Sequence, residues 1–480
     1  MLVYGSGDFA LRLSALVTIP IYTRLFDAEE YGVWSFVASA TWFLNALLIL
    51  GSDTAYTRLF FEAKTQRERQ TLTSTVLLFV GSWAVLVCLA LIPLSNLFSE
   101  SAFDSDRYGS MFVVALLGAP LVLANAVANV ALRNEFRAAL YAALNLGSAG
   151  LAVALSLAFV LLAGSGLVGL VLGPTIAAAI ALPVRLWVVR HLIRPAFSWH
   201  ALGAMLRFGL PLVPASIATW VFLVSDRLLL GTLSTAAELG LYTIAAGVVS
   251  VLTLGDAAFS QAWLPRALQI HEADRRAASV LFSRALTFVI IGFGLGAVLV
   301  TAYAHELLGL LTTEEFLGAE AAVGPLALGT VALVAARVTS IGIVTSKRTR
   351  WSAGIAVAAA ALNVSLNIAF IPDHGMLAAA WTSVATYAFV ALAELFASRR
   401  LAGTRFDVPP ALLAAAVSVA AVLGLREVES LGGRTLIVTT AAIGLASAWP
   451  WSRRRARLGA GSARALAPTH PETPAPKAPD

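Results

Sequence analysis

The sequence AALYAALNLGSAGLAVALSLAFVLLA fills residues 138–163, and LVGLVLGPTIAAAIALPVRLWVV fills residues 167–189. Arg185 is the only charged residue in either stretch. A helix needs about 20 residues to cross a hydrocarbon core roughly 30 Å thick, so each stretch is long enough to span a membrane. The short Gly/Ser turn between them predicts a hairpin of two membrane-spanning helices.

Basic residues flank this hairpin on one side only. Arg133 and Arg137 precede it and Arg190 and Arg194 follow it, whereas the turn has none. Over the whole chain, 26 of the 33 Lys and Arg residues fall in every second gap between the apolar stretches, and four fall in the gaps between those. Lys and Arg stay on the cytoplasmic side of a bilayer, so the alternation predicts a multi-pass protein with both termini in the cytosol. The predicted spans, about fourteen by length, cover residues 2–26, 32–57, 71–98, 109–132, 138–163, 167–189, 207–231, 239–264, 279–304, 320–345, 351–371, 375–397, 408–425 and 433–451.

Composition excludes several classes of protein. Apolar residues make up 59% of the chain, charged residues only 12%, and the mean hydropathy is +0.83, unlike a soluble domain with roughly 25% charged residues. The net charge of +6 is spread over short loops and a tail, so no nucleic-acid partner is expected. The single cysteine, Cys88, excludes an internal disulfide. The first apolar stretch contains Asp8 and Arg12, so it is interpreted as a span rather than a cleavable signal.

The predicted fold is an all-α polytopic membrane protein with two six-helix lobes around a central cavity and a C-terminal helix pair. A weak internal repeat relates the two halves of the chain. An arginine followed by a Glu-x-Gly motif occurs in the first half at Arg24 and 30–32 (EYG), and in the second half at Arg227 and 238–240 (ELG). The predicted domains are the first lobe at 1–189, a basic interfacial linker at 190–206, the second lobe at 207–400, the extra pair at 401–451 and a disordered cytoplasmic tail at 452–480.

Four motifs carry a family resemblance. Residues 20–26 (PIYTRLF) followed by 30–32 (EYG) resemble the signature that joins the first two spans of bacterial polysaccharide-biosynthesis flippases. This is the Wzx-like branch of the multidrug/oligosaccharidyl-lipid/polysaccharide exporter superfamily. The further matching pieces, in the family's order, are 208–214 (FGLPLVP), 226–230 (DRLLL) and 238–242 (ELGLY).

The resemblance implies a function in the bacterial inner membrane. Such a flippase moves a polyprenyl-pyrophosphate-linked oligosaccharide, such as an O-antigen or exopolysaccharide unit, from the cytoplasmic to the periplasmic leaflet by alternating access. The implied partners are this lipid-linked glycan, membrane lipids, and polysaccharide polymerase or export proteins. No cofactor and no metal site are expected, and no enzymatic activity.

Depth in the membrane selects the candidate site residues, because a charge at mid-bilayer costs at least about 2.5–3.5 kcal/mol whereas one near an interface costs little. Arg337, Asp256 and Arg12 lie about halfway along their spans. Arg24 and Arg227 lie at exterior ends and Arg58 at a cytoplasmic end. The predicted pyrophosphate-binding residues are Arg12, Arg24, Arg58, Arg227 and Arg337, and the candidates for coupling to H⁺ or Na⁺ are Asp8, Asp53 and Asp256.

Each of these candidates has a structural alternative. Asp8 with Arg12, four residues apart on one helical face, and Asp256 with Arg337 are pairs that would simply join helices. Polar amides inside spans, such as Asn125 with Asn129 or Asn363 with Asn367, fit either sugar hydroxyls or contacts between helices.

Three other functions compete with the first. A drug or metabolite cation antiporter would share the fold, but its cavity should be acidic, whereas here the deep charges balance. A peptidoglycan lipid-precursor flippase fits the sequence equally well. A membrane-bound polymerase or ligase would need a large exterior loop with catalytic residues, and the longest exterior gap, about 305–320, has one His and no nucleophile–base pair.

Overall fold

The computed structural model describes residues 18–428 and 430–465, and throughout this part the chain forms helices joined by short connections. The predicted all-helical, membrane-spanning fold is confirmed. Among the described residues, ten helices are long and apolar enough to cross a membrane, or up to eleven if one bent pair counts as a single span. Each predicted span from the second to the fourteenth contains a helix, and the first lies mostly outside the described residues.

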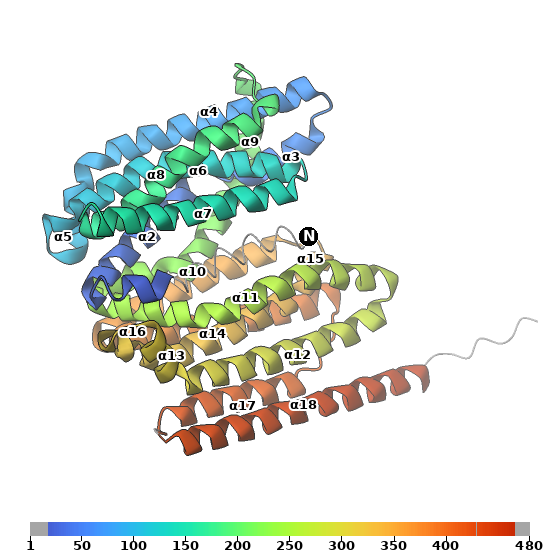
Figure 1. Cartoon of the computed structure of the whole chain (residues 1–480). Coiled ribbons are helices and arrows are strands. Elements are labelled where there is room, and N and C mark those ends of the chain that lie inside the picture. The colour runs from blue at the N-terminus through green and yellow to red at the C-terminus, as the bar shows by residue number, and fades with distance from the viewer. Residues whose placement is uncertain (1–17, 429, 466–480) are drawn as a thin grey trace, which may run out of the picture.

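The helices form two bundles, one above the other in Figure 1. The first bundle contains α2 (Ala28–Leu48), α3 (Ser52–Glu62), α4 (Gln66–Leu91), α5 (Ser95–Phe103), α6 (Gly109–Asn134), α7 (Ala138–Leu161) and α8 (Gly166–Val188). The second contains α10 (Val213–Leu233), α11 (Ala236–Ala273), α12 (Arg275–Ala302), α13 (Ala304–Leu311), α14 (Glu320–Thr339), α15 (Ile341–Thr345) and α16 (Arg350–Ala402). α2 lies where the bundles meet and packs on α10 and α11.

The two ends of the molecule differ in charge, and we name them accordingly. The acidic end, where α2 and α11 begin and α13 lies, carries Asp27, Glu30, Glu314 and Glu315. The basic end, where α3, α9 (Trp199–Gly209) and α15 lie, carries Arg190, Arg194, Lys347 and Arg348.

The predicted span 32–57 is two helices rather than one. α2 ends at Leu48, α3 begins at Ser52, and their axes differ by 40°. Leu50 and Gly51 at the break both have positive φ, a conformation that favours glycine. A Cβ on Gly51 would lie 2.7 Å from the carbonyl oxygen of Gly209, so the break also allows close approach of the segment that joins the bundles.

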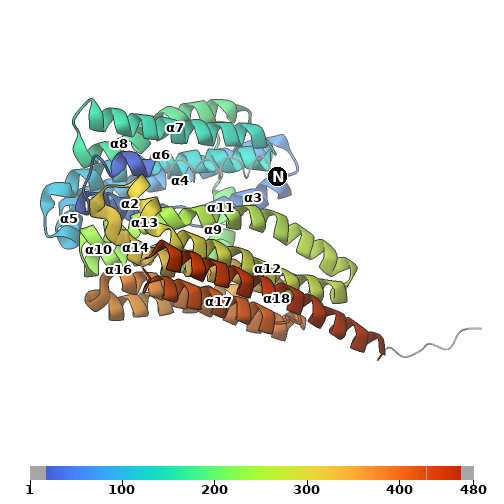
Figure 2. The same ribbon diagram turned by 60° about the horizontal axis from the view of Figure 1, so that its bottom comes forward.

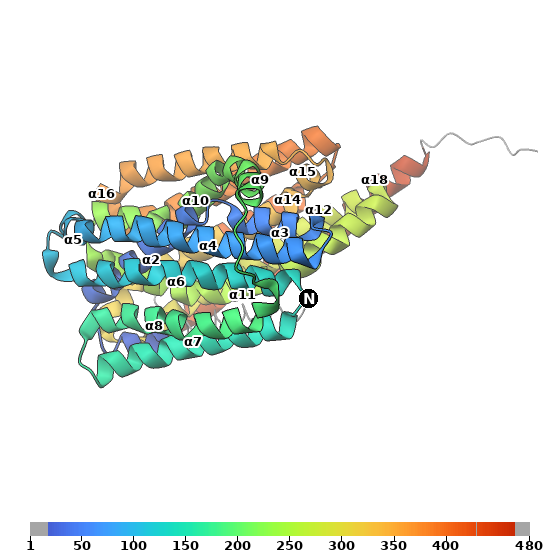
Figure 3. The same cartoon turned by 90° about the horizontal axis from the view of Figure 1, so that it is seen from above.

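The joining segment lies along the first bundle. It contains a short 3₁₀ turn at Arg190–Leu192 and α9 (Trp199–Gly209), and Figure 3 shows it crossing α4. The backbone N–H of Arg194 donates to Ser74 Oγ at 2.8 Å, and that of Ser198 donates to Thr75 Oγ1 at 3.1 Å. The side chain of Trp199 remains 78% exposed, as suits a residue at a membrane interface.

α16 is a hairpin of two long arms. The chain turns at Gly375, where φ is 53° and ψ is −133°. The carboxylate of Glu238 fills the space that a Cβ there would need, and its Oε2 accepts a hydrogen bond from the backbone N–H of Met376 at 2.7 Å. Glu238, the first residue of the ELG motif, therefore fixes the turn of α16 against the start of α11.

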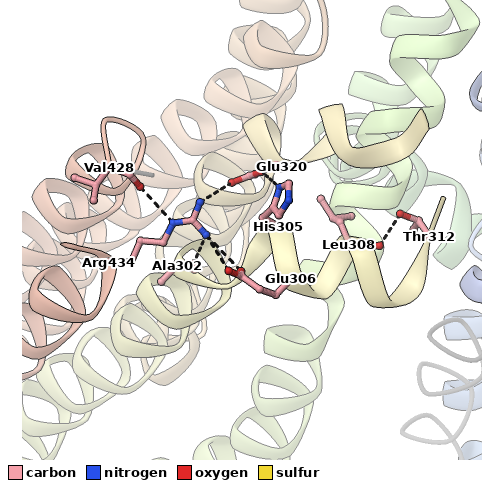
Figure 4. Close-up of polar contacts among 8 residues, drawn as sticks. All are labelled: Ala302, His305, Glu306, Leu308, Thr312, Glu320, Val428 and Arg434. Atoms are coloured by element: carbon pink, nitrogen blue, oxygen red, sulfur yellow. Dashed lines mark hydrogen bonds and ion pairs between the residues drawn. The ribbon is translucent and has the colours of Figure 1, made fainter. Parts of the chain in front are cut away.

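The extra helices α17 (Pro409–Leu425) and α18 (Leu431–Ala465) pack on the outer side of α12 (Figure 2). Arg434 at the start of α18 joins them to the acidic end of the second bundle. Its Nη1 lies 3.2 Å from Glu306 Oε1 and its Nη2 lies 3.9 Å from Glu320 Oε1, as Figure 4 shows. His305 Nδ1 lies 3.0 Å from the second oxygen of Glu320. Arg434, one of the few bases outside the alternating set, thus docks the helix pair.

Candidate functional site

The two bundles touch through the glycines of the two related motifs. Gly32 is in the second turn of α2 and Gly240 is in the second turn of α11. A Cβ on Gly32 would lie 1.7 Å from the carbonyl oxygen of Ala236, and a Cβ on Gly240 would lie 2.0 Å from that of Ala28. Only glycine permits these helices to come so close, so the EYG and ELG motifs form one contact between the halves.

Polar groups support this contact on both sides. Ser35 Oγ and Thr243 Oγ1 form a hydrogen bond of 2.6 Å between α2 and α11. The backbone N–H of Ala28, in the unpaired first turn of α2, donates to Glu315 Oε1 at 2.9 Å. Together with the glycine contact these bonds close the acidic end between the bundles. The acidic-end seal therefore comprises Gly32, Ser35, Gly240, Thr243 and Glu315.

Arg337 and Asp256 form an ion pair between α14 and α11. Arg337 Nε lies 2.7 Å from Asp256 Oδ1, and the Arg337 side chain is 46% exposed whereas that of Asp256 is 8% exposed. Asp256 Oδ1 also accepts from Ser260 Oγ at 3.1 Å, and Glu394 of α16 interacts electrostatically with Arg337. Five N–H groups point out of a guanidinium, and only Nε–H has a partner among the described residues. The two Nη groups of Arg337 therefore have no hydrogen-bond or ion-pair partner among the described residues, and Glu394 is a second carboxylate that interacts with the guanidinium.

Arg227 of α10 lies beside a buried carboxylate of the same helix. Its guanidinium is 5.9 Å from the centre of the Tyr242 ring, and its side chain is half-buried. The neighbouring Asp226 is buried and accepts hydrogen bonds from Tyr242 Oη and, at 3.5 Å, from Ser383 Oγ. The DRLLL and ELGLY motifs, separate in the sequence, thus form one polar contact.

The remaining predicted residues lie apart from these two. Arg24 is exposed and donates to the carbonyl oxygen of Pro20 in its own helix turn. Arg58 is exposed at the basic end, with Nε 2.7 Å from Glu62 Oε1 and its guanidinium 4.5 Å from the centre of the Phe208 ring. Asp53 is half-buried in the first turn of α3. Asp8 and Arg12 lie outside the described residues.

Asn363 of the amide pair in α16 is occupied by contacts between helices. Asn363 is fully buried, and its Oδ1 accepts from Ser225 Oγ at 2.7 Å and from Asn367 Nδ2 at 2.9 Å. Its Nδ2 donates to Thr386 Oγ1 at 3.3 Å. These bonds join α10 to both arms of α16, which is the structural alternative that the sequence left open for such amides.

Arg185 is the polar residue that sequence reasoning misplaced. Counted with the bases of the adjoining loop, it lies instead inside α8 with only 4% of its surface exposed. Its guanidinium donates hydrogen bonds to Asn125, Asn129 and Asn145. The signal in the sequence was that Arg185 falls within the predicted span 167–189, together with amides in two neighbouring spans.

Within residues 18–428 and 430–465, no group of three or more His, Cys, Asp or Glu side chains is arranged to hold a metal ion.

Comparison with known proteins identifies the family. A family model described as "Polysaccharide biosynthesis protein" matches residues 1–271, which is more than half of the chain. The matched residues include the parts of α2 and α11 that form the acidic-end seal. The chain belongs to this family. No curated protein matches the sequence.

Solved transporter structures share the fold of this polysaccharide biosynthesis protein. A lipid II flippase MurJ in an inward closed conformation aligns with a TM-score of 0.72 and 14% identity, over 93% of this chain and 98% of that one. An inward-facing multidrug resistance MATE family transporter of the MOP superfamily aligns with a TM-score of 0.63 and 16% identity, over 82% and 98%. An outward-facing MATE transporter aligns with a TM-score of 0.56 and 15% identity, over 84% and 94%. These structures are a flippase and two transporters, and the chain has the fold that they share.

Proposed function

We propose that this protein is a flippase that moves a polyprenyl-pyrophosphate-linked oligosaccharide from the cytoplasmic to the outer leaflet of the bacterial inner membrane. One observation carries the proposal: a chain of the polysaccharide biosynthesis family has, over 93% of its length, the fold of a lipid II flippase. Lipid II is itself a lipid-linked saccharide. The glycan that this protein carries is proposed to be the repeat unit of a surface polysaccharide such as O-antigen or exopolysaccharide.

The two bundles suit alternating access. In the proposed orientation the basic end faces the cytoplasm, since Lys and Arg are retained there. The acidic-end seal then closes the outer side, and the closed contact of Gly32 with Ala236 marks the gate that must open for release. Arg337, with four free N–H groups, is the proposed ligand of the pyrophosphate in the second bundle. Arg12, Arg24, Arg58 and Arg227 are proposed as further cationic contacts along the path.

A flipping assay tests this function directly. Proteoliposomes that contain the purified protein and a polyprenyl-pyrophosphate-linked saccharide are treated with a membrane-impermeant enzyme that labels the sugar. We expect the labelled fraction to rise with time well above that of protein-free vesicles. Equal labelling with and without protein, or normal surface glycan in a deletion strain that has no redundant transporter, would refute the proposal. Transport of organic cations in place of the glycan lipid would favour an antiporter instead.

Ion coupling is a separate part of the proposal. Intramembrane carboxylates commonly couple transport to ions, and Asp8, Asp53 and Asp256 are the proposed candidates. We expect transport in vesicles to fall when the proton or sodium gradient is collapsed by a selective ionophore. Transport that is insensitive to both ionophores would exclude coupling while leaving the flippase function intact.

A further inference from the structure

The first bundle contains a buried arginine held by neutral groups alone. Arg185 lies in α8, three residues before the helix ends at Val188, or about 5 Å along the axis from the basic end. Its side chain touches α6 and α7. The acceptors of its guanidinium are Asn125 Oδ1 at 2.7 Å, Ser148 Oγ at 2.9 Å, Asn129 Oδ1 at 3.1 Å, Asn145 Oδ1 at 3.1 Å and the Leu144 carbonyl oxygen at 3.2 Å.

The charge of this group is not compensated. Arg337 and Arg434 each lie within 4 Å of a carboxylate, whereas no carboxylate of the described residues pairs with Arg185. Hydrogen bonds to neutral acceptors orient a guanidinium but leave its full positive charge, and removing such a charge from water is costly. If Arg185 were only a structural clip, that is, a side chain that links α6, α7 and α8, the fold would be more stable with a carboxylate beside it or with an uncharged residue in its place. The arrangement keeps a positive charge ready for a negatively charged ligand.

The amides around Arg185 are fixed with their oxygens toward it. Asn125 Nδ2 donates to the backbone of α6 and α8, and Asn129 Nδ2 donates to Asn145 Oδ1 at 2.9 Å. Asn125 is buried, whereas Asn129, Asn145 and Ser148 are half-buried, so the network is open on the side of Asn145 and Ser148. The Nδ2 of Asn145 donates to no described residue. An anion arriving on this side meets a cation and an amide N–H₂ group with unused donors.

We propose that Arg185, with Asn145 and Ser148, forms a phosphate-binding site in the first bundle that receives the pyrophosphate of the substrate as it enters from the basic end. In this site, phosphate oxygens take the place of Ser148 Oγ and Asn145 Oδ1 as acceptors of the hydrogen bonds from Arg185 Nη2. The side-chain amide of Asn145 then rotates, and its Nδ2 donates a hydrogen bond to the phosphate. The exchange replaces hydrogen bonds from the guanidinium to neutral oxygens with bonds to an anion, so that the positive charge of Arg185 is compensated. This site rests on the proposed flippase function, and it places the first phosphate contact in the opposite bundle from Arg337.

The Asn145→Asp substitution distinguishes between the two roles of Arg185, a phosphate-binding site and a structural clip. In every described hydrogen bond, Asn145 acts as an acceptor, so an aspartate preserves both bonds and adds a charge that pairs with Arg185. A clip would be kept or strengthened by this change. A phosphate site would be neutralised. Ala139→Asp adds the same charge to an exposed position in the first turn of α7, six residues before Asn145, and serves as the matched control.

The probe is inorganic pyrophosphate, titrated onto the purified full-length protein and followed by calorimetry and by thermal stability. We expect Asn145→Asp and Arg185→Gln to weaken binding about tenfold or more, the loss of one charge-assisted hydrogen bond, and Ala139→Asp to change it less than about twofold. Asn145→Asp should retain the unfolding temperature of the parent protein. Its flipping rate with the glycan lipid should fall in parallel with pyrophosphate affinity.

Two outcomes would overturn the site. The first is a parent protein that binds pyrophosphate no better than Arg185→Gln. The second is Asn145→Asp with unchanged affinity and flipping, which would make Arg185 a clip between α6, α7 and α8. Either result leaves the flippase function standing, since that function fails only if the parent protein does not flip the glycan lipid.

Discussion

At the scale of single residues, neighbours determine what an arginine does. Arg337 keeps four N–H groups free because Asp256 occupies only Nε, whereas Arg434 is held between Glu306 and Glu320 and serves to dock a helix. Arg58 lies against Phe208 at the basic end and pairs with Glu62. The same type of side chain thus docks a helix at Arg434 and has partners at Arg337 and Arg58 that differ in number and charge.

Replacing Arg337 tests its proposed role as a ligand. We expect Arg337→Ala to lower the flipping rate at least about tenfold, because one charge-assisted bond to the substrate is lost. Arg12→Ala is expected to abolish complementation of a deletion strain in the same way. Flipping in proteoliposomes and recovery of surface glycan measure the two effects, and Arg67→Ala, which changes an exposed residue in the first turn of α4, is the control.

Arg337→Ala also leaves Asp256 buried without its partner, which destabilises the fold. The double variant Arg337→Gln/Asp256→Asn removes both charges together and should elute as a monodisperse folded protein while transport remains low. Transport at the parent level in the double variant would assign the pair to packing alone.

At the scale of elements, close approach of backbones determines how the bundles join. α2 and α11 touch because Gly32 and Gly240 have no side chain, and the Ser35–Thr243 bond lies three residues, about one turn, further along both helices. The same end holds Glu238, whose carboxylate fixes the hairpin of α16. A contact of this kind opens or closes as a unit, since interdigitated helices have few intermediate arrangements.

Gly32→Ala is expected to open the acidic-end seal, because its Cβ would lie 1.7 Å from the Ala236 carbonyl oxygen and the helices must separate. The reporter is Ser35→Cys in a Cys88→Ser background, since Ser35 is buried in the seal and Cys88 is the only native cysteine. We expect a polar thiol reagent to modify the reporter several-fold faster in Gly32→Ala, in line with a shift of about 1 kcal/mol or more between the two states. The control is Gly81→Ala, where no atom lies within 4 Å of the new Cβ, and equal rates in both variants would contradict the seal.

At the scale of the whole molecule, the structure is closed at one end between two bundles. The contacts of α2 with α10 and α11 hold the bundles together at the acidic end, and the fold aligns better with the inward-facing than with the outward-facing MATE structure. Alternating access requires that this contact separate in each transport cycle.

Locking the seal should therefore stop transport. Ser35 Oγ and Thr243 Oγ1 lie 2.6 Å apart, so cysteines at both positions are close enough for a disulfide, in a Cys88→Ser background. We expect the oxidised double-cysteine variant to lose nearly all flipping and to regain it on reduction, whereas each single cysteine variant keeps activity in both conditions. Full transport by the oxidised, cross-linked protein would show that the acidic end need not open.

Much of this architecture could be read from the sequence because a bilayer imposes it locally. Each stretch such as 138–163 is apolar over about 20 residues, and the position of Lys and Arg in alternate gaps follows from the same barrier. The break at Leu50 and Gly51 was not predicted, since the predicted span 32–57 runs through Gly51, Ser52 and Asp53 without interruption, and the positive φ occurs where Gly51 meets Gly209. Span number and helix class are one-dimensional properties, whereas a break of this kind depends on a contact with a distant segment.

The sequence by itself determined that the chain is a multi-pass helical protein and that its motifs are those of a polysaccharide-biosynthesis family. Only the tertiary structure decided what those motifs touch: that the glycines of EYG and ELG meet each other's helices, that Asp256 occupies one edge of Arg337, and that Arg185 is enclosed by three amides. The reason is physical. Crossing a membrane is a property of each segment alone, but the partner of a buried charge is set by which helices pack side by side, and residues tens to hundreds of positions apart in the chain make that choice.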